Sequence, residues 1–272
     1  VMRISADCRN NKRRLALIKD ALIGGGLLAV TFLTNFYYGY FMLLFTGAFF
    51  VSRVIYIIFS GRSLLCVCKG ETFKNYILSH LIIFATAGLI SAPFIYPVLS
   101  DARQSAKSDQ SFLRRDSYQR PILNLLSLSA RPWDYFIPSA DHPVFGQFVP
   151  RIYEWIKARS DDFKTISAPP HERTIFLGIT TIILALTALA TVILKKRNFD
   201  EERKVILPLA VTGLILFLFS LPPYVFLAGR QIYLPTYFLY QIFPMFRTYA
   251  RLGVIVLLLI ILLAGWGIKF LL

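Results

Sequence analysis

The chain has 272 residues, of which 56% are hydrophobic and 15% aromatic, and its mean hydropathy is +0.58. A soluble domain of this size carries more charge and shorter apolar runs, so the composition argues against a soluble protein. The net charge of +15 is large, but the lysines and arginines lie in loops between apolar runs, where anionic lipid and membrane topology account for them. Because the sequence also lacks helix-turn-helix, RNP and zinc-finger patterns, we do not expect nucleic acid as a partner.

Six apolar stretches are long enough, at about 20 residues, to cross a hydrocarbon core as helices. They are expected at residues 16–34, 37–59, 76–98, 174–194, 205–227 and 252–272. The first two come from one nearly unbroken apolar stretch, residues 21–58, which as a single helix would be about 57 Å long, far more than a bilayer core of about 30 Å. We place a break at residues 34–39, because Asn35 and Gly39 suit a turn and the tyrosines beside them suit a membrane interface.

Positive charge orients these spans. The segments expected on the inner side, residues 1–20, 60–75 and 195–204, hold 14 Lys and Arg, whereas the outer segment 228–251 holds 3. This asymmetry predicts that the N-terminus lies inside and residues 99–173 outside. Because charged residues shorten its apolar part, the segment at 16–34 could alternatively be a re-entrant half-helix.

The predicted fold class is all-α: a polytopic transmembrane helical bundle with one long extracytoplasmic loop that contains short surface helices. Residues 1–98 and 174–272 are expected to form two three-span membrane regions on either side of the loop, residues 99–173. Within the loop we expect a charged surface helix at 101–120, an amphipathic stretch at 122–128, an ordered non-helical segment at 133–146 and an amphipathic helix at 148–164. The three cysteines, Cys8, Cys66 and Cys68, fall in or beside inner segments, where thiols stay reduced.

Asp134, Asp141 and His142 form the first constellation that could carry chemistry. Carboxylates near a membrane surface can act as a general base, bind sugar hydroxyls or hold a divalent cation. The alternative is structural, with Asp141 and Ser139 capping a turn around the prolines and Asp134 solvated.

His171 and Glu172 form the second constellation, at the expected start of the fourth span. Glu172 would lie in the first helical turn, where the helix dipole favours an anion, so a capping role is sufficient to explain it. The alternative is a buried carboxylate that faces a cavity between the helices.

Arg247 and Arg251 form the third constellation. They are four residues apart and share one face of a helix, just before the last span. Two guanidinium groups there suit a lipid phosphate or pyrophosphate, which they bind bidentately. The alternative is that both side chains extend to lipid headgroups without a specific ligand.

Nucleotide-binding and hydrolase motifs are missing from the sequence, including the P-loop, GxGxxG, HExxH and GxSxG patterns. The spans contain very few ionisable residues besides Arg53 and His80, which lie near span ends. This scarcity argues against a proton-driven pump, where chains of buried acids and bases are expected.

Four segments resemble a known superfamily. They are Leu-Thr-Asn-Phe-Tyr-Tyr-Gly-Tyr at 33–40, Pro-Ser-Ala-Asp-His-Pro-Val-Phe-Gly at 138–146, His-Glu-Arg-Thr-Ile-Phe-Leu-Gly at 171–178 and Phe-Pro-Met-Phe-Arg-Thr-Tyr-Ala-Arg-Leu-Gly at 243–253. Their order along the chain resembles that of the GT-C glycosyltransferases, particularly the YfhO-like branch of large bacterial multi-spanning proteins.

The resemblance implies transfer of a sugar from a polyprenyl-phosphate donor to an envelope or glycan acceptor, on the outer face of the membrane. It also implies a location in the cytoplasmic membrane of a bacterium, substrate contacts at Asp141, His142 and Glu172, and lipid-phosphate contacts at Arg247 and Arg251. Asp134 and His171 are further candidates for substrate binding because of their residue types. Some branches of the superfamily use a divalent cation and others do not. Their catalytic acid lies in an outer loop after the first span, which does not occur here, so we expect the sequence to be a piece of a longer protein. The competing hypothesis is a non-enzymatic membrane protein for lipid or polysaccharide export or envelope assembly.

Overall fold

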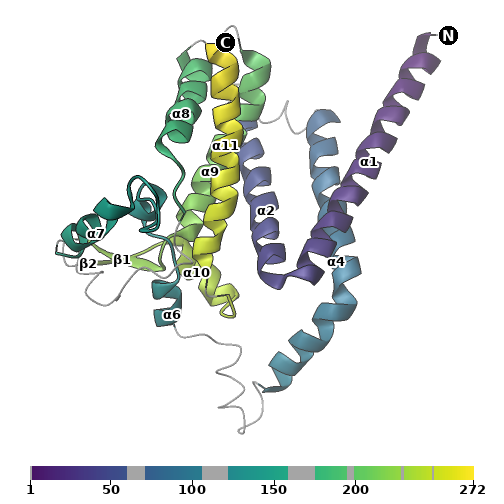
Figure 1. The fold of residues 1–272 in the computed structure, drawn as a ribbon. Helices are drawn as coiled ribbons and strands as arrows, with labels where there is room; N and C mark the ends of the chain where they lie inside the picture. Colours follow the sequence, from purple (N-terminus) through teal and green to yellow (C-terminus); the bar gives the residue numbers. More distant parts are fainter. Residues whose placement is uncertain are drawn as a thin grey trace. The chain divides into compact units, whose positions relative to one another are not determined.

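The computed structural model describes residues 2–59, 71–105, 122–158, 175–194, 199–227, 230–246 and 248–272. The chain divides into two compact units, residues 1–111 and 112–272, and each is described by itself. Helices dominate both units, and the described residues contain one small two-stranded sheet (Figure 1).

The first unit consists of α1 (Met2–Thr34), α2 (Phe36–Phe59) and α4 (Glu71–Ser105). The predicted break between the first two spans is confirmed, since a single residue, Asn35, separates α1 from α2. The Oδ1 of Asn35 accepts hydrogen bonds from the backbone N–H groups of Tyr37 and Tyr38, at 3.1 and 3.3 Å, and so caps α2. A Cβ on Gly39 would lie 2.3 Å from the Cα of Phe32, so glycine allows α2 to turn back closely along α1.

The core of the first unit lies between α1 and α4. Leu28, Ala29 and Ala87 are buried there, and partly buried hydrophobic side chains from α2 and α4 pack against them. The first five residues of the surface helix expected at 101–120 are helical, but they form the end of α4 instead of a separate helix. The rest of that predicted helix, residues 106–120, lies outside the described residues.

The second unit combines three longer helices with several short elements. In chain order they are α6 (Ile122–Ser127), η2 (Pro132–Tyr135), η3 (Gly146–Phe148), α7 (Val149–Lys157), α8 (Ile179–Leu194), α9 (Asp200–Ser220), β1 (Tyr224–Leu227), β2 (Arg230–Tyr233), α10 (Pro235–Ile242), η6 (Tyr249–Arg251) and α11 (Leu252–Leu271).

Helices α8, α9 and α11 pack side by side around Ala185, Val192, Ile206 and Leu263. A Cβ on Gly267, near the end of α11, would lie 2.0 Å from the carbonyl oxygen of Leu184 in the first half of α8. Glycine is therefore what lets these two backbones approach. Helix α9 runs in the opposite direction to α11, since Glu202 near its start forms an ion pair with Lys269 near the end of α11, at 3.2 Å.

The fourth apolar segment begins its helix later than predicted. It was expected to be helical from residue 174, but Ile175–Gly178 is not helical and α8 begins at Ile179. Gly178 has φ +79°, a conformation that favours glycine and redirects the chain into the helix. A Cβ on Gly253, at the start of α11, would lie 2.5 Å from the Cδ1 of Ile175, so this non-helical part runs beside α11 as α8 does.

The fifth helix ends earlier than predicted, at Ser220 instead of residue 227. Pro222 disfavours a helical conformation for the residue before it, and Leu221 is extended, with φ −69° and ψ 164°. The chain then forms an unpredicted hairpin in which β1 pairs antiparallel with β2 and Tyr224 lies opposite Tyr233.

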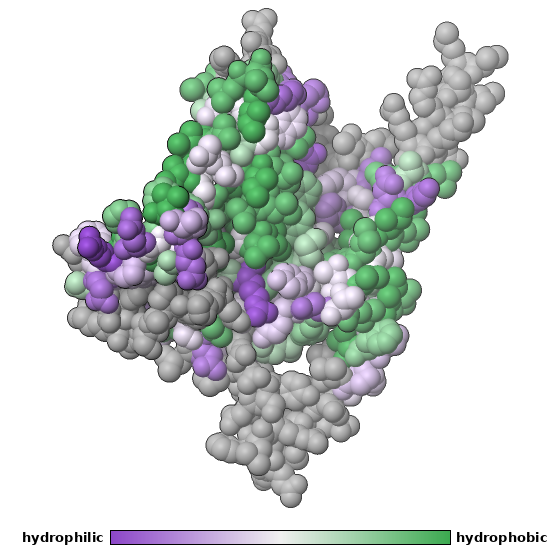
Figure 2. Space-filling model, viewed as in Figure 1, coloured by the Kyte–Doolittle hydropathy of each residue, from purple (hydrophilic) through white to green (hydrophobic). Residues whose placement is uncertain are grey.

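Five helical segments are long and apolar enough to cross a membrane: Arg14–Thr34, Phe36–Phe59, Lys74–Pro97, Asp200–Ser220 and Tyr249–Leu271. Helix α8 is apolar but has only 16 residues. Figure 2 shows hydrophobic residues over the outward sides of α8 and α11, a continuous apolar surface of the kind that lies against lipid or another protein. The expected all-α fold is therefore confirmed, and five of the described helices have the length and apolar composition of a span.

Candidate functional site

A group of short elements packs on the ends of α9 and α11. We call residues 122–158, together with residues 224–242, the cap. The backbone N–H of Ala130 donates to the carbonyl oxygen of Ser220 at 2.9 Å, and that of Ala250 donates to Leu128 at 3.2 Å. The hydroxyl of Thr236 donates to the carbonyl oxygen of Phe219 at 3.0 Å. The two segments that the sequence predicts to be on the outer side therefore meet at one end of the same helix pair.

The first part of the cap, residues 122–158, contains the elements that were predicted from the sequence. The amphipathic stretch at 122–128 forms α6, which buries Leu125 and Leu126. The helix predicted at 148–164 forms as α7, over Val149–Lys157, and residues 159–164 lie outside the described residues. The segment at 133–146 is ordered, as expected, but it includes most of the 3₁₀ turn η2 and so is not wholly non-helical.

Tyr135 connects the cap to α9. Its side chain is 1% exposed, its ring packs against that of Phe217 with 4.9 Å between centroids, and its hydroxyl lies 2.6 Å from the Oγ of Ser220. Its carbonyl oxygen accepts a hydrogen bond from the backbone N–H of Leu177, at 3.0 Å. Burial raises the pKa of Tyr135 far above its usual value, the hydrogen bond with Ser220 lowers it, and the charge of Asp134 raises it further. The phenol therefore stays neutral at physiological pH.

Asp134 lies inside the cap, with 1% of its side chain exposed. Its Oδ2 accepts a hydrogen bond from the backbone N–H of Arg131 at 2.8 Å, and its Oδ1 accepts one from the hydroxyl of Tyr153 at 3.3 Å. The alternative that Asp134 is solvated is wrong, because this carboxylate closes the turn η2 and attaches it to α7. A carboxylate held in this way positions the cap and leaves little access for a sugar.

Arg131 is the largest of the fully buried side chains, with 2% exposed, and its Nη2 donates to the carbonyl oxygen of Leu126 at 3.4 Å. Arg131, Tyr135 and Tyr153 were not among the candidate residues predicted from the sequence. The available signal was the spacing Arg131-Pro-Trp-Asp134, because a proline followed two residues later by an acid is typical of a capped first turn.

Asp141 and His142 lie on a turn in the cap. The Oγ of Ser139 accepts a hydrogen bond from the backbone N–H of Asp141 at 3.2 Å, and it also lies 3.5 Å from the Asp141 carboxylate. The Nδ1 of His142 lies 3.2 Å from the backbone N–H groups of Val144 and Phe145, and it accepts both bonds. These contacts match the turn-capping alternative, although the Asp141 side chain remains exposed.

Arg251 ends η6 and directly precedes α11, next to buried Tyr249 and Ala250, and its side chain is half-buried. This position places it where the cap joins the membrane helices. The other three candidates, His171, Glu172 and Arg247, lie outside the described residues. The structure thus places Arg251 beside the cap that contains the Asp134 turn, because the neighbouring Ala250 donates its N–H to Leu128.

Within the described part of the chain, no group of three or more His, Cys, Asp or Glu side chains is arranged to hold a metal ion. Comparison with known proteins gives no match to a family model, to a curated protein or to a solved structure.

Proposed function

We propose that this chain is part of a membrane glycosyltransferase of the GT-C type, which transfers a sugar from a polyprenyl-phosphate donor on the outer face of the bacterial cytoplasmic membrane. The observation that supports the proposal is the meeting of the two predicted outer segments in one cap, with Arg251 where the cap joins α11. A lipid-linked donor requires such a place, because its phosphate lies at the membrane surface while its chain stays in the bilayer.

Arg251, with Arg247 four residues before it, is the proposed phosphate-binding group. Arginine presents several N–H donors in a planar fork that matches a phosphate. The start of α11 adds backbone N–H groups and the positive end of a helix dipole on the same side. Both features favour the phosphate of the donor, and of the polyprenyl phosphate left after transfer.

The catalytic base is expected outside this sequence. Asp134 is buried and both of its oxygens accept hydrogen bonds, so it supports the cap. An inverting transfer needs a carboxylate that can reach the acceptor hydroxyl, and the GT-C resemblance implies that an outer loop after the first span of such proteins supplies it.

We also propose six crossings, the fourth of which combines non-helical and helical backbone. Its 16 helical residues cover about 24 Å at about 1.5 Å each, and four non-helical residues add at most about 13 Å, which together suffice for a core of about 30 Å. Non-helical backbone at membrane depth is tolerated where protein covers it, and Ile175 and Leu177 are buried.

The test is transfer of radiolabelled sugar from polyprenyl-phosphate donors, in membranes that contain the full-length protein. We expect Arg251→Gln to lower transfer by about tenfold or more, as loss of a charge-assisted hydrogen bond would. Arg230→Gln is the matched control, because Arg230 belongs to the same outer segment but is exposed on β2. Equal transfer by wild type and Arg251→Gln would remove Arg251 from the site.

A non-enzymatic role in export or envelope assembly is the second candidate. It is favoured by the fact that Asp134 and Asp141 both make local hydrogen bonds in the cap. The full-length sequence separates the two: a glycosyltransferase must have an Asp or Glu in an outer loop after an upstream span, and its absence would favour the non-enzymatic role.

A further inference from the structure

The β1–β2 hairpin and α10 form one body at the end of α9. We call residues 224–242 the arm. The rings of Tyr233, at the end of β2, and Tyr237, in α10, lie 4.5 Å apart. The hydroxyl of Thr236 donates to the carbonyl oxygen of Phe219, in the last turn of α9. The arm is therefore fixed at the point where α9, which has the length and apolar composition of a span, ends.

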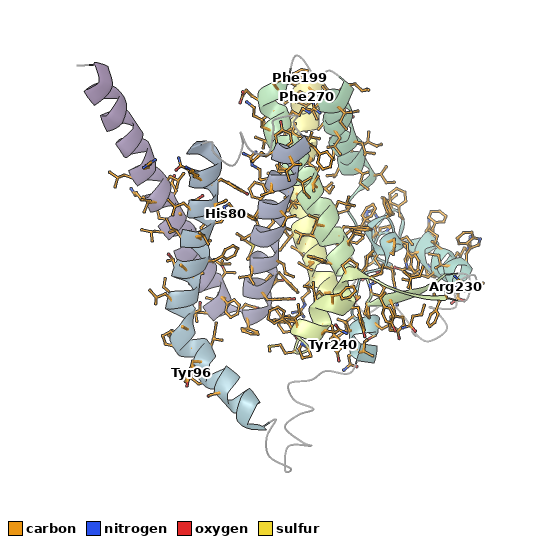
Figure 3. The ribbon with its side chains drawn as sticks, turned by 180° about the vertical axis from the view of Figure 1, so that it is seen from behind. His80, Tyr96, Phe199, Arg230, Tyr240 and Phe270 are labelled. Atoms are coloured by element: carbon orange, nitrogen blue, oxygen red, sulfur yellow. The ribbon has the colours of Figure 1, made fainter. Side chains whose placement is uncertain are left out.

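The hairpin runs across the direction of α9 and α11. In Figure 1 and in the reverse view of Figure 3, β1 and β2 extend sideways from the end of this helix pair. Figure 3 shows Arg230 far out to the side and Tyr240, in α10, at the end of the helices. Because we propose that α9 and α11 cross the bilayer, the hairpin lies parallel to the membrane surface, near the level where these helices leave the hydrocarbon core.

Both faces of the hairpin expose large apolar side chains. Val225 lies opposite Ile232, and Phe226 lies opposite Gln231. Side chains alternate along a strand, so Phe226 and Ile232 point to opposite faces. Phe226 is 52% exposed and Ile232 is 42% exposed. A two-stranded hairpin is at best marginally stable in water, so we expect an apolar environment on both of its faces.

Helix α10 extends this apolar surface. Phe238 and Ile242 are four residues apart and so share one face of the helix, and they are 58% and 66% exposed. The whole arm contains one charged residue, Arg230, and six of its 19 residues are aromatic. Tyrosines are typical of the membrane–water interface, where the ring meets apolar groups and the hydroxyl meets water. The composition of the arm therefore favours lipid over bulk water around its exposed side chains.

We propose that the arm is an in-plane membrane anchor, which inserts its exposed apolar side chains between lipid headgroups on the side of the membrane that the charge distribution predicts to be outer. The outer edges of its two-stranded sheet indicate the depth. In the hydrocarbon core their backbone N–H and C=O groups would be without water, whereas at the headgroup level water satisfies them.

Lipid explains the distribution of exposed side chains better than a protein partner does. A folded partner would cover one face of the arm, whereas lipid surrounds both faces of the hairpin and the outer face of α10. The anchor holds the cap against the membrane, and it does not depend on the proposed sugar transfer.

The experiment measures which medium each side chain meets, in the full chain reconstituted in liposomes of phosphatidylcholine and phosphatidylglycerol. The native cysteines are replaced by serine, and a nitroxide spin label is attached to Phe226→Cys, Ile232→Cys or Phe238→Cys. Oxygen concentrates in lipid and a nickel chelate stays in water, so the ratio of their collision rates with the label reports its surroundings. We expect a ratio severalfold higher at all three positions than at Asp141→Cys, on the exposed turn of the cap. Leu214→Cys, on the exposed side of α9, is the reference for lipid.

Two results would overturn the proposal. A ratio at Phe226→Cys and Phe238→Cys as low as at Asp141→Cys would show that the arm lies in water. Low collision rates with both reagents would show that protein covers the arm, either a second copy or another segment of the full-length chain. The melting temperature of each labelled variant is compared with that of wild type, and Ile242→Cys replaces any variant in which it falls, because Ile242 is exposed in the same arm.

Discussion

The hydroxyl of Tyr135 lies 2.6 Å from the Oγ of Ser220, and this contact joins the cap to the last residue of α9. The two residues are 85 positions apart in the chain. The Ser220 hydroxyl also donates to the carbonyl oxygen of Phe217, at 2.6 Å, so in this pair the phenol is the donor and Ser220 the acceptor. Attachment of the cap therefore depends on a neutral tyrosine.

Tyr135→Phe should lower the stability of the protein by about 1 kcal/mol, since it removes one buried hydrogen bond and keeps the ring. Its effect should depend on pH. Burial raises the folded-state pKa of Tyr135 above the usual value of about 10. The phenol is thus protonated in both folded and unfolded chains below pH about 10, and wild type loses stability as the pH rises above that value. The melting temperature should fall more steeply at alkaline pH in wild type than in Tyr135→Phe.

Tyr233→Phe, on exposed β2, is the control and should behave like wild type. Parallel curves for wild type and Tyr135→Phe would contradict the prediction.

Gly267→Ala should destabilise the packing of α8 on α11 by about 1–3 kcal/mol, because the new Cβ would lie 2.0 Å from backbone at Leu184. Gly265→Ala is its control, since a Cβ at Gly265 meets nothing within 4 Å. That control should be neutral or should stabilise the helix by up to about 1 kcal/mol. Thermal unfolding in detergent measures both, and the same sign of change in the two variants would refute this account of the interface.

Asp134→Ala should cost about 2–3 kcal/mol, because it leaves the Arg131 N–H and the Tyr153 hydroxyl without this acceptor inside the cap. Asp141→Ala should change stability by less than about 0.5 kcal/mol, since its side chain is exposed. Limited proteolysis reports the local effect: cleavage near α7 should become faster only in Asp134→Ala. Equal protection of both variants would show that Asp134 does not hold η2 to α7.

Asp141→Cys should react with a membrane-impermeant maleimide in intact cells, because the turn is exposed and is predicted to lie outside. The native thiols, Cys8, Cys66 and Cys68, are predicted to lie inside, so wild type should react only after the cells are made permeable. If Asp141→Cys reacts only in permeable cells, the predicted orientation of the chain is wrong.

Hydropathy predicted the positions of most long helices, because a span must be apolar over about 20 residues whatever its neighbours are. The turn between α1 and α2 could be predicted because its cause is local: the side chain of Asn35 caps α2. The burial of Asp134 was not predicted, because it depends on Tyr153 from another element. The predicted end of α9 was wrong because the sequence stays mostly apolar through Leu227. The prediction did not take into account that Pro222 and Pro223 disfavour a helix at this point.

The non-helical segment Ile175–Gly178 makes the completion of this fold depend on the order of biosynthesis. Its Leu177 N–H is bonded to Tyr135, which has already been made, but Ile175 packs on Gly253, nearly 80 residues later. On the ribosome, this segment therefore emerges before the surface that covers it. We expect a chain truncated before α11 to leave it accessible to chaperones and proteases, so that insertion of the fourth apolar segment is completed only when the last helix arrives.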